Sequence, residues 1–209
     1  KDKLHFFIAP EWQSRSQPAI GPYEGGPTTE SGNISPDTLR RIANAINPLF
    51  PIGGTGLVST GNPLTNLSGR LDWQVNGGNR VVFRQLYNTA EQDNFSRNNR
   101  NFNAAVGNQN SGFRYTSNLY TTQDDNISSV LQVFSQFAKG SSNEFLFGYN
   151  HIKDERVVPV QSPEVSVQVT NLQGSTNASA TFGTEEFSPG NLLKQDIFEL
   201  ANNYNMPIG

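Results

Sequence analysis

The strongest constraint on the fold is an unbroken alternation of side chains over residues 67–76. Leu67, Gly69, Leu71, Trp73 and Val75 alternate with Ser68, Arg70, Asp72, Gln74 and Asn76. A period of two places the two sets on opposite faces of a β-strand. The pattern therefore predicts a strand with one apolar face and one polar face.

Similar alternation, interrupted by turn residues, predicts five more strands. The six predicted strands cover residues 4–12, 67–76, 80–88, 113–138, 143–152 and 194–205. Three-residue turns at 77–79 and 140–142 keep the apolar residues of each hairpin on one face. With those turns, Trp73 lies opposite Phe83 and Phe137 lies opposite Phe145.

One helix is predicted over residues 36–47. Ser35 can act as the N-cap, and Pro36 suits the first helical position. The apolar residues follow helical spacing at Leu39, Ile42, Ala43 and Ile46, before Pro48 ends the segment. We expect this stripe to pack on neighbouring loops.

The connections between the predicted strands alternate between short and long. The turns 77–79 and 140–142 contrast with long loops at about 13–66, 89–112 and 153–193, which are rich in Gly, Pro, Asn and Ser. In an antiparallel meander, all the long loops then lie at one end of the sheet. Compact soluble domains rarely carry several such loops, whereas transmembrane β-barrels have short turns on one side and long loops on the other.

The composition agrees with a barrel and excludes several classes of protein. Hydrophobic residues make up 34% and charged residues 16% of the chain, and 25 of the 209 residues are Asn. A barrel needs only its lipid-facing positions to be apolar. The net charge of -3 argues against nucleic-acid binding driven by bulk charge. The absence of cysteine excludes disulfides and thiolate metal sites.

The expected fold is all-β: an antiparallel up-and-down meander of about six strands, with long loops and one short helix. The whole chain, 1–209, is expected to be part of a larger transmembrane β-barrel, because known barrels start near eight strands. An open sheet would also leave two unpaired edges in lipid.

The barrel interpretation assigns each face of the sheet to a medium. The side chains expected to face lipid are Leu71, Trp73, Phe83, Phe145 and Phe147. Those expected to face the lumen are Arg70, Asp72 and Arg84. The aromatic residues expected at the membrane boundaries are Trp12, Tyr87 and Tyr204.

Short motifs in chain order resemble TonB-dependent outer-membrane receptors, most closely the Oar-like subgroup with a carboxypeptidase-regulatory-like domain. The first is the opening strand Lys1-Asp2-Lys3-Leu4-His5-Phe6-Phe7. The others are Arg70-Leu71-Asp72-Trp73 with Asn79-Arg80, Asn143-Glu144-Phe145 with Gly148-Tyr149, Asp154-Glu155-Arg156, Gly183-Thr184, Phe187-Ser188 and Gln195-Asp196. Their order along nearly the whole chain carries the resemblance more than any one motif.

The resemblance implies a transporter that imports a bulky ligand across the bacterial outer membrane, driven by TonB. The implied partners are the remaining barrel strands, a plug domain, outer-membrane lipid, and TonB through a plug region that this sequence does not contain. The family's ligand contacts lie in variable outer loops and the plug apex, so the resemblance assigns no single position here as a binding residue.

No catalytic, cofactor-binding or metal-binding residue is predicted, and the chain is not expected to be an enzyme. Gly54-Thr55-Gly56 lacks the preceding strand and following helix of a phosphate loop. The acidic pairs Asp124-Asp125 and Glu185-Glu186 match no EF-hand spacing. His5 and His151, the only histidines, fall within predicted strands and have no evident partner.

Two other functions remain open from the sequence. A secreted, soluble β-sandwich that binds glycan or protein through its long loops would show the same alternation, because such sheets also have one wet face. A hydrolase is the third possibility, although no set of residues with the spacing of a catalytic site is visible.

Overall fold

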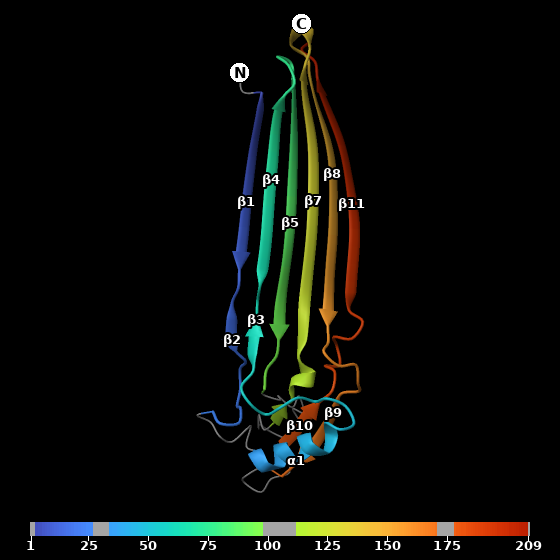
Figure 1. The fold of residues 1–209 in the computed structure, drawn as a ribbon. Coiled ribbons are helices and arrows are strands. Elements are labelled where there is room, and N and C mark those ends of the chain that lie inside the picture. Colours follow the sequence, from blue (N-terminus) through green and yellow to red (C-terminus); the bar gives the residue numbers. More distant parts are fainter. Residues whose placement is uncertain (1–2, 27–33, 98–111, 171–177, 209) are drawn as a thin grey trace.

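The computed structural model describes residues 3–26, 34–97, 112–170 and 178–208, and shows a long sheet that carries a small cap at one end (Figure 1). Six strands form the sheet in chain order: β1 (Leu4–Gln13), β4 (Leu64–Gln74), β5 (Asn79–Asn94), β7 (Tyr120–Gln136), β8 (Ser142–Val157) and β11 (Leu192–Asn205). All neighbouring pairs are antiparallel. The predicted six-stranded antiparallel meander is therefore confirmed.

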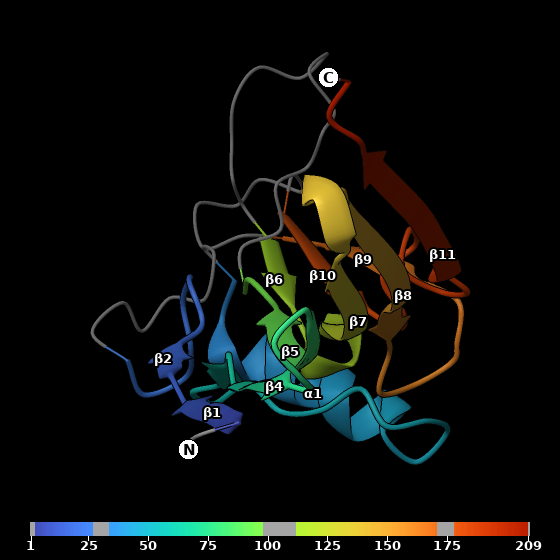
Figure 2. The same ribbon diagram turned by 90° about the horizontal axis from the view of Figure 1, so that it is seen from above.

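The long sheet is open. Its two outer strands are β1 and β11, which are not paired with each other. Figure 2, which looks along the strands, shows the six of them as one row with these two at its ends. Within the described residues the sheet does not close into a barrel.

The two ends of the sheet differ as the loop lengths predicted. Residues 75–78 join β4 to β5 and residues 137–141 join β7 to β8, both at the end where β1 begins and β11 ends (Figure 1). All three long connections lie at the opposite end. The first and third are shorter than expected, because β4 begins at Leu64 and β8 continues to Val157. The second keeps about its expected length but lies later in the chain, because β5 continues to Asn94 and β7 begins only at Tyr120.

The predicted registers of both hairpins were wrong, although the faces were right. Trp73 pairs with Val81 rather than Phe83, because the turn occupies 75–78 instead of 77–79. The Asn76 side chain accepts a 2.9 Å hydrogen bond from the Gly78 amide and closes this earlier turn. An even shift in register leaves every side chain on its original face.

The second turn also departs from the expected residues 140–142. Phe145 pairs with Val133, and Phe137 lies outside β7 instead of facing Phe145. A short 3₁₀ turn, η2 (Ala138–Gly140), follows, with Lys139 at a φ of 64°. The turn therefore spans 137–141, which moves the register by four residues.

The predicted strand 113–138 was also wrong in its first part. That part divides into β6 (Gly112–Arg114) and the 3₁₀ turn η1 (Thr116–Asn118), and β7 begins only at Tyr120. The reason is burial in the cap: the Tyr115 hydroxyl donates a 2.6 Å hydrogen bond to the Leu39 carbonyl. Alternation alone could not distinguish this second sheet from the long one.

The cap is built from all three long connections. A three-stranded sheet has the order β6-β10-β9, with β10 (Ala178–Phe182) between β6 and β9 (Val165–Val169). The helix α1 (Pro36–Ile46) packs on this sheet. Separately, β2 (Ser16–Pro18) pairs with β3 (Ser59–Gly61).

The cap contains the hydrophobic core of the described chain. Its buried members are Ile34, Leu39, Ala43, Ile52, Phe113, Tyr115, Ala178, Ala180 and Phe182. The α1 stripe packs here as predicted, with Leu39 and Ala43 buried and Ile42 and Ile46 partly buried. The helix begins at Pro36 as expected, but the Ser35 side chain makes no capping hydrogen bond.

We predict that Leu39→Ala destabilises the cap by about 2–5 kcal/mol, because it leaves a cavity in a packed core. The matched control is Leu49→Ala: Leu49 is 76% exposed, so its truncation is expected to cost less than about 0.5 kcal/mol. Hydrogen exchange of the α1 amides measures both effects. Equal protection in the two variants would contradict the assignment of this core.

Candidate functional site

The most extensive candidate surface is one face of the long sheet, where apolar side chains gather in register. Read from β1 to β11, successive levels are Leu4-Trp73-Val81-Val133-Phe145-Asn202, Phe6-Leu71-Phe83-Leu131-Phe147-Leu200, Ile8-Gly69-Gln85-Ser129-Tyr149-Phe198 and Pro10-Leu67-Tyr87-Ile127-His151-Asp196. We call the large apolar side chains of these levels, together with Trp12, the apolar belt. It includes all five positions that the sequence assigned to lipid.

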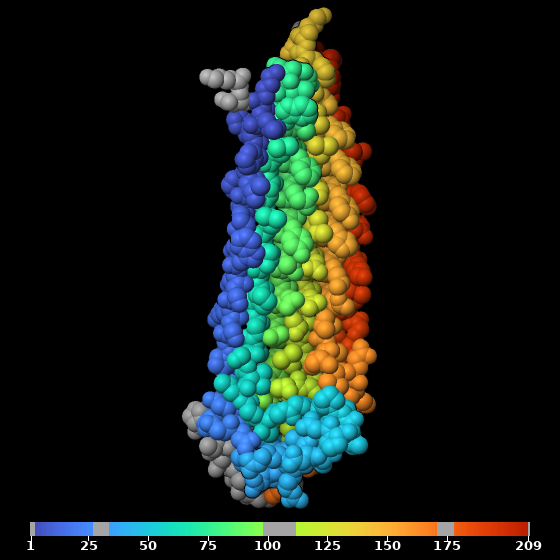
Figure 3. Space-filling view, viewed as in Figure 1, coloured from blue at the N-terminus to red at the C-terminus, as the bar shows by residue number. Residues whose placement is uncertain are grey.

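The apolar belt is uncovered. At the sheet edges Phe6 is 76% and Leu200 72% exposed, and in the middle Leu71 and Phe83 are each 39% exposed. Their burial comes from neighbours in the same sheet, because no described element packs on this face. In the space-filling view, α1 covers only the cap end (Figure 3).

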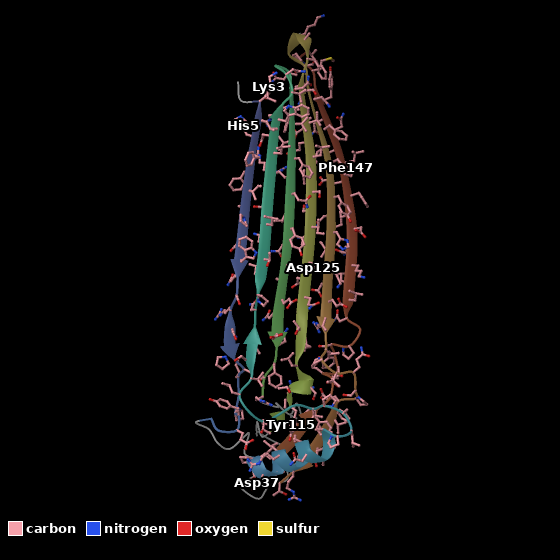
Figure 4. The ribbon with its side chains drawn as sticks, in the orientation of Figure 1. Lys3, His5, Asp37, Tyr115, Asp125 and Phe147 are labelled. Atoms are coloured by element: carbon pink, nitrogen blue, oxygen red, sulfur yellow. The ribbon has the colours of Figure 1, made fainter. Side chains whose placement is uncertain are left out.

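The side of the belt that faces the cap is bounded by charge. Trp12 lies at the same level as Asp125, Lys153 and Lys194 on β7, β8 and β11. Figure 4 shows Asp125 nearer the cap than Phe147. Beyond this level the same face continues with Glu91, Gln123 and Glu155.

This boundary crosses the sheet obliquely. Going toward the cap, the last large apolar residue before the charges is Trp12 on β1 and Phe198 on β11. The β11 residue at the level of Trp12 is Lys194, so the boundary on β11 lies four residues farther from the cap than on β1. On β4, β5 and β7 the boundary lies at one intermediate level, that of Leu67, Tyr87 and Ile127. On β8 it lies at Tyr149, the level of Phe198. Four residues correspond to about 14 Å and five interstrand spacings to about 24 Å, so the boundary slopes by about 30° from the perpendicular to the strands.

The opposite face of the sheet is hydrogen-bonded and polar. Arg70 contacts Asp72 through two hydrogen bonds of 2.6 and 2.9 Å. Arg84 donates a 2.6 Å hydrogen bond to Gln132, which donates one of 3.1 Å to Glu144. Arg70, Asp72 and Arg84 thus lie on the face that the sequence assigned to the lumen.

A shallow groove of about 410 Å³ crosses this polar face near the β1 edge. Phe7, Arg70 and Arg84 line it together with Ser68, Leu86, Ser128 and Val130. Phe7 lies beside Arg70, which pairs with Arg84 on its other side. An aromatic ring next to guanidinium groups can pack against another protein surface while its neighbours form hydrogen bonds.

Arg97 is the most deeply buried charged residue of the described chain, at 2% exposed. Its Nη1 donates hydrogen bonds of 2.9 Å to the carbonyls of Gly54 and Arg114, and its Nη2 donates one of 2.6 Å to the Gly56 carbonyl. The guanidinium carbon also lies 4.7 Å from the centre of the Phe113 ring. Arg97 therefore joins the loop before β3 to the β6 strand.

Burial and hydrogen bonding shift three pKa values in the cap. Burial lowers the pKa of Arg97 to about 10, so the side chain stays charged at neutral pH. Burial raises the pKa of the Tyr115 hydroxyl, which remains a donor. The hydrogen bond from Thr55, followed by the charge of Arg40, lowers the pKa of Glu24.

The glycine-rich segment that resembled a phosphate loop has the opposite polarity. The carbonyls of Gly54 and Gly56 point at the Arg97 cation, whereas a phosphate loop directs backbone N–H groups at an anion. Thr55 donates its hydroxyl to Glu24. This segment is used for packing within the cap.

The other residues singled out in the sequence are separated from one another. Asp124 and Asp125 lie on opposite faces of β7, and Glu185 accepts hydrogen bonds from the Ser188 hydroxyl and the Phe187 amide. His5 lies on β1. Across the ranges that the structure describes, no group of three His, Cys, Asp or Glu side chains is placed to hold a metal ion.

His151 has a partner that the sequence did not reveal. Its Nδ1 lies 2.8 Å from Asp196 Oδ1, and the Tyr149 hydroxyl donates a 2.7 Å hydrogen bond to the same oxygen. His151 and Asp196 face each other across β8 and β11. The cluster lies where the charged boundary meets the belt.

Sequence reasoning missed Arg97 and most of the cap core. The available signal for the core was the alternation of Ala178, Ala180 and Phe182 with polar residues, which is a five-residue strand pattern. Arg97 gave no signal, because an arginine in an Asn-rich loop is ordinarily exposed.

Comparisons with known proteins do not identify a family for this chain. No protein-family model, curated protein or solved structure matches it. Among the described residues, no helix has the length and hydropathy needed to cross a membrane.

We predict that Arg97→Lys destabilises the cap by about 1.5–3 kcal/mol, because one ammonium cannot replace the guanidinium fork at three carbonyls and a charged hydrogen bond is lost. Arg41→Lys, the same change at an exposed position of α1, is expected to have no measurable effect. Denaturant unfolding followed by hydrogen exchange in β6 and α1 tests this. Equal stability of both variants would show that Arg97 does not hold the cap together.

Proposed function

We propose that this chain is a segment of a transmembrane β-barrel in the bacterial outer membrane, and that the complete protein is a TonB-dependent transporter that imports a bulky ligand. The observation that carries the barrel proposal is the uncovered apolar belt with its oblique charged boundary. The transport proposal additionally rests on the resemblance of short sequence motifs to those of Oar-like receptors.

The slope of the boundary is what a tilted strand in a membrane requires. Barrel strands tilt by about 35–45° from the membrane normal. The line along which the membrane surface meets the sheet is then inclined by the same angle of about 35–45° from the perpendicular to the strands. The limit of the apolar residues should follow this line. The observed slope of about 30° lies close to this range.

The height of the belt also suits a bilayer. From Leu4 to Trp12 is eight residues of β1, or about 27 Å along the strand, which a tilt of about 35–45° reduces to about 19–22 Å along the membrane normal. The outward apolar band of an outer-membrane barrel is about 25 Å tall. Trp73 and Trp12 lie at the two limits of the belt, where indole side chains favour the boundary between lipid and water.

The open edges call for further strands. The outer edges of β1 and β11 present backbone groups with no strand partner among the described residues. In hydrocarbon each such group costs several kcal/mol. The remaining barrel strands are the proposed partners on both sides, and they add to the sheet without changing its faces.

The proposal also assigns each end of the long sheet to one side of the membrane. Short turns face the periplasm and long loops face outward in this class of barrel, so the cap is the extracellular part. The polar face lines the lumen. The groove beside Phe7, Arg70 and Arg84 is the proposed contact for a plug domain, through which TonB would act.

A soluble β-sandwich is less well supported. It requires a second layer over the apolar belt, and the described residues supply none. The chain would then expose Phe6, Ile8 and Trp12 on β1 and Phe198 and Leu200 on β11 to water, which favours aggregation of the two edges.

The proposal predicts that lipid accessibility alternates along the strands. Because the chain has no cysteine, single cysteines can be introduced and spin-labelled at Leu71, Phe83 and Phe147, with Arg70 and Arg84 as matched positions on the other face. In membranes of cells that make the natural protein, the first three are expected to favour dissolved oxygen and the last two a water-soluble relaxation agent. Equal access of all five to the water-soluble agent, or a protein found entirely in the soluble fraction, would refute the barrel.

A further inference from the structure

A groove of about 570 Å³ lies between α1 and β9 in the cap. Its lining residues are Thr38, Arg41, Ile42, Asn44, Ala45, Val167 and Val169. Thr38, Arg41, Ile42 and Ala45 follow the spacing of one helical stripe, so a continuous face of α1 forms one wall. Figure 1 shows α1 beside β9 and β10 at the far end of the cap.

The other wall is the outer strand of a sheet. β9 pairs with β10 on one side, and no described residue pairs with its other side. Val167 and Val169 pack partly against the cap core, yet they also line the groove. The backbone of β9 therefore offers hydrogen-bonding groups next to an apolar floor, which is the arrangement that accepts an added strand.

The helix side of the groove carries a positive charge that no described acidic residue pairs with. Arg40, the neighbour of Arg41, forms ion pairs with Glu24 and Asp37. Arg41 has no ion pair with the described residues, and its side chain is exposed at the groove. A carboxylate bound beside Arg41 would gain a charge-assisted hydrogen bond.

From these three features we infer that the groove binds an extended, acidic peptide segment of a partner protein as a fourth strand beside β9. Alternate apolar side chains of the peptide contact Ile42, Ala45 and Val167, and one acidic side chain contacts Arg41. The peptide backbone pairs with the open edge of β9. This inference goes beyond the proposed function and does not depend on it, because it concerns the cap and not the apolar belt.

Backbone pairing favours a peptide over a lipid or a small apolar ligand. A lipid or a small apolar ligand would occupy the apolar base of the groove near Val169. Neither would form hydrogen bonds with the backbone N–H and C=O groups at the open edge of β9. A strand uses both, and its specificity comes from pockets for alternate side chains. The five residues of β9 set the length of the paired segment.

The test uses a phage-displayed library of random seven-residue peptides, selected on the whole natural chain. We expect enrichment of sequences with apolar residues at alternate positions and Asp or Glu at one position of the same face. A fluorescein-labelled peptide of the enriched sequence should bind at least tenfold more tightly than the same peptide with alternate backbone amides N-methylated.

Two variants with a matched control locate the binding site. Ala45→Gln fills the groove from an exposed helix position and should weaken the labelled peptide at least tenfold. Leu49→Gln adds the same side chain just after the helix, outside the groove, and should leave affinity unchanged. Selection on Arg41→Glu should replace the acidic residue by Lys or Arg.

Several outcomes would overturn the inference. One is no enrichment on the natural chain relative to Ala45→Gln. Another is equal binding of the N-methylated peptide, which would indicate an apolar ligand site instead of strand addition. A third outcome is that Ala45→Gln increases the affinity for none of the peptides but makes a segment of this chain more accessible to protease. That result would indicate that a segment of the chain itself occupies the groove. A failed lipid-accessibility experiment would leave all these outcomes unaffected.

Discussion

Backbone pairing between neighbouring strands holds the long sheet together, and almost no side-chain core assists it. Among the described residues Val82 is the one large apolar side chain buried in the six strands, at 2% exposed. Stable sheets in water normally bury one face against another layer. A sheet whose described residues bury neither face needs a cover for its apolar side, and the proposal assigns that role to lipid.

The cap solves the opposite problem. In the proposed barrel it lies outside the membrane. It has its own core, a helix packed on three short strands, and a buried charged residue, Arg97, that joins separate connections through three carbonyls. Such a core makes the cap a preassembled element and not a set of independent loops. A preassembled groove loses less conformational entropy when it binds a partner.

The sequence predicted the long sheet well and the cap poorly, for a physical reason. Period-two alternation identifies the faces of a strand such as β4, and even register shifts at Gly78 and Phe137 leave those faces intact. The exact turns depended on the Asn76 side chain and on a left-handed Lys139, which alternation does not encode. The cap depends on contacts between residues far apart in the chain, such as Tyr115 with Leu39, and single-segment patterns carry no information about them. The one helix was found because its stripe and its prolines are local.

The two tryptophans provide the most direct test of the claim that lipid covers the apolar belt. Trp12 and Trp73 are the only tryptophans of the chain, and they lie at opposite limits of the belt. In membranes that contain the protein, lipids brominated near the headgroup should quench their fluorescence more strongly than lipids brominated at the chain end, and Trp12→Phe should leave this order unchanged for Trp73. Quenching by aqueous iodide with no effect of either brominated lipid would contradict the account.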